Sequence, residues 1–182
     1  MKKWNQHTGR YEEFSPGKRR YPQLPTDLVR QLRNIPATAN YGVHYHPCRV
    51  VLTDGNAVDC VFMVDAEEYI TTWGIWPDQD EGKSEISIND VVRIEASPYR
   101  LPVQFAQRLY DAGESGMGYV LFEILYRDGS NSYHVSGNAV DFVGLPPEKT
   151  IDDIKEVNPH KGRNAEYQLR SPAYSWCLFS IK

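Results

Sequence analysis

His44, His46 and Cys48 have the residue types and the spacing of metal ligands. They stand at alternate positions of the segment 44–48, and alternate side chains of an extended strand point to the same face. Two imidazoles and a thiolate would then converge on one zinc ion, which takes four protein ligands, or three and a water molecule. The remaining ligand would come from elsewhere in the chain: His134, His160 or a carboxylate such as Asp59. A metal-binding protein or a metal-dependent enzyme is therefore one alternative.

A second interpretation of the same segment needs no metal. Pro47 bends the approach to the strand, and Cys48 stands where a small buried apolar residue would be equally suitable. The three cysteines of the chain are an odd number without CxxC spacing, which argues against a disulfide framework or a cysteine-rich zinc site. We favour this interpretation, two half-exposed histidines beside a packed cysteine, and expect no cofactor; zinc remains the alternative.

A strongly acidic segment is the second candidate site. Residues 54–95 contain eleven Asp or Glu against two Lys or Arg, a net charge of −9, although the whole chain carries only −4. Clustered carboxylates accelerate the encounter with a positive partner, and aromatic residues at the border can serve as buried anchors. The predicted interface consists of Glu67, Glu68, Trp73, Trp76, Asp78, Asp80, Tyr99 and Arg100. Its aromatic residues could instead pack the long loop onto the domain.

The N-terminal residues 1–25 are predicted to form an irregular basic arm. Residues 1–20 carry six Lys or Arg against two Glu, and glycines and prolines punctuate the segment. Its aromatic residues would suit stacking on bases, but nucleic-acid binders normally concentrate positive charge on the folded body. Tails of this composition are usually solvated or docked on their own fold. A small-barrel nucleic-acid binder is therefore kept only as an alternative.

Glycine, proline and apolar periodicity predict the elements that position these residues. Asp-Gly at 54–55 and 128–129 predicts the turns of two β-hairpins. Pro102 and Gly113 bound a helix with one apolar face. The remaining predicted elements are helices at 27–34 and after Thr150, strands at 69–73 and 91–95, and a closing strand at 174–181.

Together the elements predict an α+β protein of mainly antiparallel β structure. We expect residues 26–182 to form a single domain, built on a strongly bent sheet or small barrel with two or three short helices. The segment Arg49–Ile94, with its hairpin, acidic loop and following strand, resembles SH3-like or Sm-like small barrels. Gly-Asn-Ala-Val-Asp occurs at 55–59 and again at 137–141, which indicates either an internal duplication or convergence on common hairpin chemistry.

The sequence favours a non-enzymatic interaction protein over an enzyme. No Ser/His/Asp or Cys/His set stands in a local context that would orient it. The acidic, aromatic-bordered face predicts a basic protein as the partner; by analogy, a toxin-neutralising immunity or inhibitor protein would have this character. No apolar run has the length of a membrane span, and the first residues lack the apolar stretch of a signal peptide. We therefore expect a cytoplasmic protein that does not enter a membrane.

Overall fold

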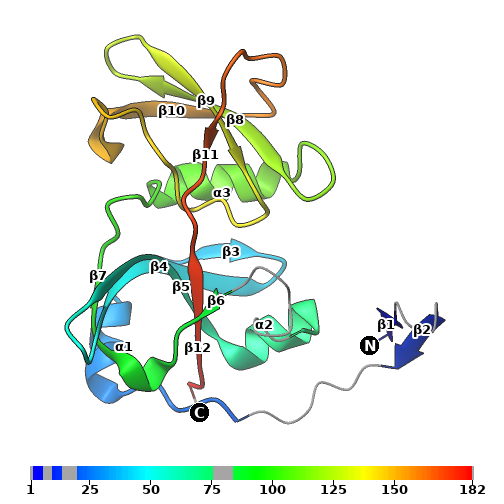
Figure 1. The fold of residues 1–182 in the computed structure, drawn as a ribbon, viewed down its shortest axis with the longest axis vertical. Coiled ribbons are helices and arrows are strands. Elements are labelled where there is room, and N and C mark those ends of the chain that lie inside the picture. Colours follow the sequence, from blue (N-terminus) through cyan, green and yellow to red (C-terminus); the bar gives the residue numbers. More distant parts are fainter. Residues whose placement is uncertain (1, 6–9, 14–19, 76–83, 182) are drawn as a thin grey trace.

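A computed structural model describes residues 2–5, 10–13, 20–75 and 84–181. In these residues the chain is an α+β protein with three α-helices and two mixed β-sheets, besides a separate two-stranded hairpin (Figure 1). The helices are α1 Thr26–Leu32, α2 Ala66–Trp73 and α3 Val103–Ala112, and the short 3-10 helices are η2 Ile88–Asp90 and η3 Ile151–Asp153. The predicted fold class, α+β with a few short helices, is confirmed at this level.

The larger sheet contains six strands of the described chain, in the order β3-β4-β5-β12-β6, with β7 also paired to β4. Their bounds are β3 Thr38–Asn40, β4 Val43–Leu52, β5 Ala57–Asp65, β6 Ser84–Glu85, β7 Val91–Glu95 and β12 Ser175–Phe179. The first residues of β4 pair with β3 and the last with β7. Register irregularities after Cys48 and Val51 interrupt β4, and such irregularities bend a strand.

The smaller sheet has the order β10-β8-β9-β11, and α3 packs on it. Its strands are β8 Val120–Tyr126, β9 Asn131–Ser136, β10 Ile154–Pro159 and β11 Leu169–Arg170. Helix α3 begins after Pro102 and ends at Gly113, whose φ of +74° is a conformation that favours glycine. The C-terminal segment, red in Figure 1, runs from β11 in this sheet to β12 in the larger one.

Both predicted hairpins form, and their turns have the same hydrogen bonds. Asp54 Oδ1 accepts from Asn56 N at 2.9 Å, and Asp128 Oδ1 accepts from Ser130 N at 3.0 Å. The intervening glycine has a φ of +85° in the first turn and +88° in the second, which explains the Asp-Gly dipeptide. The repeated pentapeptide is not equivalent, because its first copy spans a turn and the start of β5, whereas its second copy follows β9.

The larger sheet is not the predicted barrel, and both sheets mix antiparallel with parallel pairing. Strand β12 pairs in parallel with both β5 and β6, and β11 pairs in parallel with β9. Strands β11 and β12 come from the end of the chain and join sheets built by earlier strands. The larger sheet is open and does not close on itself. The resemblance of Arg49–Ile94 to SH3-like barrels therefore does not extend beyond the hairpin, the bent β4 and the strand β7.

Two predicted elements have a different secondary structure. Residues 69–73, predicted as a strand, belong to helix α2. The helix predicted after Thr150 is only the single turn η3, and the chain continues as β10. Within the basic arm, β1 Lys2–Asn5 and β2 Arg10–Glu13 pair as an antiparallel hairpin where the sequence predicted no regular structure.

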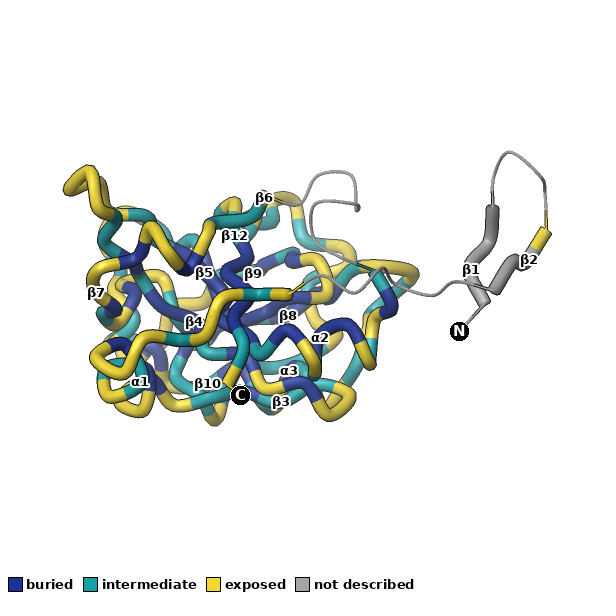
Figure 2. Tube along the Cα trace, turned by 90° about the horizontal axis from the view of Figure 1, so that it is seen from below, coloured by how far each residue is buried: buried dark blue, intermediate teal, exposed yellow. Residues whose placement is uncertain are grey.

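The core lies on both faces of the larger sheet and between α3 and the smaller sheet. Along β5, Cys60, Phe62 and Val64 face one cluster and Val61 and Met63 the other, so the central strand is buried on both sides. Figure 2 shows this burial along the inner strands, with exposed turns around them. None of the described helices is long and apolar enough to cross a membrane.

Candidate functional site

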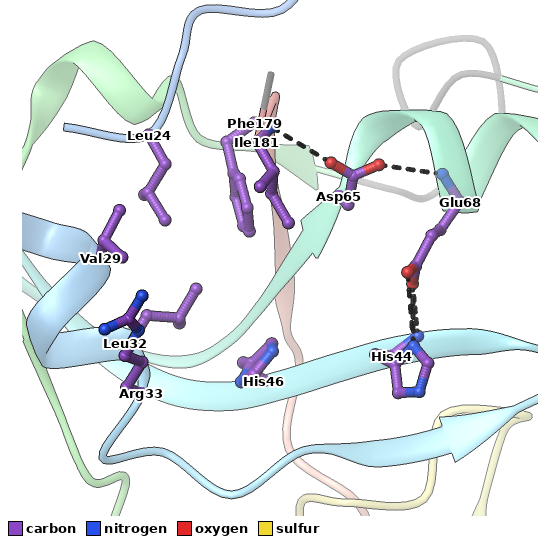
Figure 3. A pocket seen from close by; sticks show the side chains of 10 residues that line it. All are labelled: Leu24, Val29, Leu32, Arg33, His44, His46, Asp65, Glu68, Phe179 and Ile181. Atoms are coloured by element: carbon purple, nitrogen blue, oxygen red, sulfur yellow. Dashed lines mark hydrogen bonds and ion pairs between the residues drawn. The ribbon is translucent and has the colours of Figure 1, made fainter. Parts of the chain in front are cut away.

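A cavity of about 390 Å³ lies between α1, α2 and the strands β4 and β12 (Figure 3). Its volume is within the usual range of small-molecule or side-chain pockets. The cavity is lined by Leu24, Val29, Leu32, Arg33, His44, His46, Asp65, Glu68, Phe179 and Ile181. We call it the α1–α2 pocket. It contains three of the residues selected from the sequence, namely His44, His46 and Glu68.

Apolar side chains form one side of the α1–α2 pocket. Leu32 on α1 and Phe179 on β12 are almost fully buried, whereas Val29 is half-buried and Ile181 is 72% exposed. The segment before α1 is held against the C-terminal strand, because Leu24 N donates to Ser180 O at 2.9 Å. The apolar wall is thus assembled from the two ends of the folded region.

Charged and polar side chains form the opposite side, at the N-terminus of α2. Asp65 caps the helix: its Oδ1 accepts from the backbone N–H groups of Glu67 at 2.9 Å and Glu68 at 3.1 Å. Glu68 in turn accepts from the backbone N–H of His44 at 2.9 Å, and its carboxylate lies 3.1 Å from the Nδ1 of the same residue. Helix α2 is therefore tied to β4 by a carboxylate at the rim of the pocket.

His46 and Cys48 are held by other contacts. His46 Nδ1 lies 2.9 Å from the carbonyl oxygen of Ile35, and partial burial lowers the pKa of this histidine, which favours the neutral ring. Cys48 is fully buried, its Sγ donates to Val61 O at 3.5 Å, and burial raises the pKa of the thiol. A thiol with a raised pKa is a poor metal ligand, since the thiolate is the form that binds zinc.

The described residues contain no group of three or more His, Cys, Asp and Glu that could hold a metal ion. The alternation along β4 does place His44 and His46 at one pocket, as expected for a strand. However, the predicted additional ligands are elsewhere. His134 and His160 belong to the smaller sheet and its border, and Asp59 lies 3.7 Å from Arg49 Nε.

The other residues of the predicted acidic interface do not line the α1–α2 pocket. Trp73, at the opposite end of α2 from Glu68, donates through Nε1 to Tyr45 Oη at 3.0 Å. Tyr99 and Arg100 lie between β7 and α3, where Arg100 donates to the carbonyl oxygen of Pro36. Trp76, Asp78 and Asp80 lie outside the described residues.

A serine and a histidine that sequence reasoning did not pair lie within hydrogen-bond distance. Ser115 Oγ is 2.9 Å from His160 Nδ1, and His160 Nε2 is 3.1 Å from Ala112 O. The same hydroxyl accepts from Leu121 N at 2.9 Å and so joins the loop after α3 to β8. Neither residue lines one of the cavities described here, and we assign the pair a structural role.

Comparison of the chain with protein-family models, with curated proteins and with solved structures finds no match.

Proposed function

We propose that the protein binds a basic segment of another protein, without catalysing a reaction, at the α1–α2 pocket and the acidic start of α2. The observation that supports this proposal is the position of Glu68. This residue, selected from the sequence as part of an acidic interface, borders a cavity with an apolar wall. Such a cavity accepts an apolar side chain, and the adjoining carboxylates attract a positive one.

The charges around the pocket would orient the bound segment. Asp65 and Glu68 lie on the α2 side, and Glu67 is exposed in the first turn of the same helix. Arg33, at the end of α1, supplies a positive charge on the opposite side (Figure 3). A lysine or arginine of the partner would therefore lie over the start of α2, because the like charge of Arg33 disfavours the reversed orientation.

The acidic and the apolar parts of the site would affect different rate constants. Exposed carboxylates mainly raise the association rate, and salt screens them over roughly 10 Å at 0.1 M. An apolar side chain of the partner, bound between Leu32 and Phe179, would mainly slow dissociation. It must return to water before the complex can separate, and this exposure costs free energy. This difference allows the two parts to be tested separately.

The test uses a partner recovered by affinity capture, identified and purified. We expect the double variant Glu67→Gln, Glu68→Gln to associate with this partner about threefold to tenfold more slowly at low salt, with the difference disappearing at high salt. The matched control is Glu148→Gln, Glu166→Gln, which removes two exposed carboxylates away from the pocket. Ile181→Ala, a change at an exposed pocket residue, should instead accelerate dissociation. Association rates that stay equal in all variants and at all salt concentrations would contradict the proposal.

A further inference from the structure

A second hollow lies between the larger sheet, helices α2 and α3, and the segment that follows β9. It consists of two adjoining cavities of about 350 and 260 Å³, which share Asn40, Trp73, Tyr110 and Asn138. We call the combined hollow the aromatic cleft. The larger cavity is lined by six aromatic side chains: Tyr45, Tyr69, Trp73, Tyr110, Tyr174 and Trp176.

The rings of the aromatic cleft meet at several angles. The ring centroids of Tyr69 and Trp176 are 5.1 Å apart with planes inclined by 60°, and those of Tyr45 and Trp176 are 5.9 Å apart at 56°. Tyr45 and Tyr110 stack more nearly in parallel, at 6.0 Å and 23°. Tyr45, Tyr69 and Trp176 are at most 5% exposed and form the buried back of the cleft. Tyr110 and Tyr174 are half-buried and Trp73 is exposed, so the rings that a ligand can reach are mainly these three.

In two hydrogen bonds of the cleft the ring that donates becomes more electron-rich, that of Tyr110 in the first and that of Trp73 in the second. The Tyr110 hydroxyl donates to Asp141 Oδ2 at 2.6 Å, and the Tyr45 hydroxyl accepts from Trp73 Nε1 at 3.0 Å. Donation to a carboxylate makes a phenol ring more electron-rich, which strengthens its attraction for a cation. Trp73 is 37% exposed and belongs to the residue type whose ring binds cations best.

Among the described residues that line the cleft, the one charged side chain is negative. None of the described residues lining either cavity is Lys, Arg or His, whereas Glu114 lies at the smaller cavity. The Glu114 carboxylate accepts from Gly118 N at 2.9 Å and makes no ion pair within the described part of the chain. Among the described lining residues an anionic ligand would find no counter-charge, whereas a cation would find that of Glu114, so the ligand is expected to be cationic.

We propose that the aromatic cleft binds a methylated ammonium group. A methylated ammonium carries its charge on a large apolar surface and is held by aromatic rings, whereas an unmodified ammonium is strongly hydrated and needs hydrogen-bond acceptors. Aromatic rings supply the apolar contact that this group requires, and Glu114 supplies the negative charge, with no Lys, Arg or His among the described residues that line the two cavities. The inference is independent of the α1–α2 pocket, which shares no lining residue with the cleft.

The probe that tests this proposal is choline, compared with 3,3-dimethyl-1-butanol, which has the same shape without the charge. We expect calorimetry or NMR titration of the full chain to show choline binding at least tenfold more tightly than the neutral isostere. Trp73→Ala and Glu114→Gln should each weaken choline binding by about threefold or more, and Trp73→Phe less than Trp73→Ala. Tyr167→Ala, which removes an exposed aromatic ring outside the cleft, should leave it unchanged.

Four results would overturn the proposal. Equal binding of choline and its neutral isostere would show that the cleft accepts any apolar group. Choline binding that persists unchanged in a folded Trp73→Ala variant would place the cation elsewhere on the molecule. The absence of any choline binding by the folded wild-type protein, or tighter binding of a neutral monosaccharide such as glucose than of choline, would exclude the ammonium assignment.

Discussion

His134 has a different role from the one that its residue type suggests. The sequence offers it as a fourth zinc ligand, but it is 1% exposed and stacks on Phe122 with ring centroids 5.1 Å apart. Its Nε2 is 2.6 Å from Ser132 Oγ, and its Nδ1 has no hydrogen-bond partner in the part of the chain that is described. Burial therefore lowers the pKa of His134 to about 4, because the charged ring would lose its hydration.

This histidine is expected to make the protein less stable in mild acid. In the unfolded chain His134 takes up a proton below its ordinary pKa of about 6.5, whereas the folded protein takes it up only near 4, so acidification between these values favours unfolding. Relative to wild type, the free energy of unfolding of His134→Phe should rise by about 3 kcal/mol between pH 7 and pH 4.

Denaturant unfolding at several pH values measures this difference. Subtracting the two curves removes the contributions of other groups, including Asp141, whose pKa is raised to about 6 by burial and which acts in the opposite direction. Val135→Ala on the same strand, which changes no titratable or hydrogen-bonding side chain, is the matched control and should keep the wild-type pH dependence. Parallel curves for wild type and His134→Phe would contradict the prediction.

The candidate pocket could be predicted from the sequence only in part. Strand alternation predicts that His44 and His46 share a face, and both line the α1–α2 pocket. Nothing in the local sequence indicates that Leu24 and Phe179, from opposite ends of the chain, meet them there. Their approach depends on the parallel pairing of β12 with β5, which is a long-range contact.

At the scale of elements, local sequence signals correctly predict the two hairpins and α3, whereas α2 lies where the apolar pattern predicts a strand. The apolar and aromatic residues at 69–73 favoured a strand. However, Asp65 and Glu68 have the Asp-x-x-Glu spacing of a helix start, and Gly74 with a φ of +67° ends the helix. Pairing partners were less predictable than elements, because β10 and β12 join strands that are distant in the sequence.

The Asp65 cap provides a direct test of what holds α2 in place. Asp65→Ala removes the acceptor for the backbone N–H groups of Glu67 and Glu68 in the cap, and for that of Ile181 at 3.3 Å, and should lower the free energy of unfolding by about 1 kcal/mol or more. Asp65→Asn keeps a side-chain oxygen that can cap the helix and should cost only a small fraction of this. Denaturant unfolding of both variants makes the comparison. Equal destabilisation by alanine and asparagine would show that the charge, and not the capping hydrogen bonds, is what matters.

At the scale of the whole molecule, the two sheets share part of one core. Phe142, which follows the smaller sheet's strand β9, packs on Phe62 of the larger sheet with ring centroids 4.8 Å apart. Asp141, in the same segment, accepts a hydrogen bond from Thr38 of β3 at 2.8 Å, and it also accepts from Tyr110 of α3. We therefore expect the two sheets to unfold as a single cooperative unit, since neither can lose this segment without exposing the core of the other.

Phe142→Ala tests this cooperativity, because Phe142 is 1% exposed and touches the larger sheet. The variant should lose about 3–5 kcal/mol of stability, the usual cost of removing a buried phenylalanine ring. Hydrogen exchange of the β5 amides reports on the larger sheet, and that of the β8 amides reports on the smaller one. Both probes should shift to the same lower midpoint in Phe142→Ala, and neither should shift in Met117→Ala, which changes a side chain that is 98% exposed. If one probe keeps its wild-type midpoint in Phe142→Ala, the sheets are separate folding units and the shared segment does not couple them.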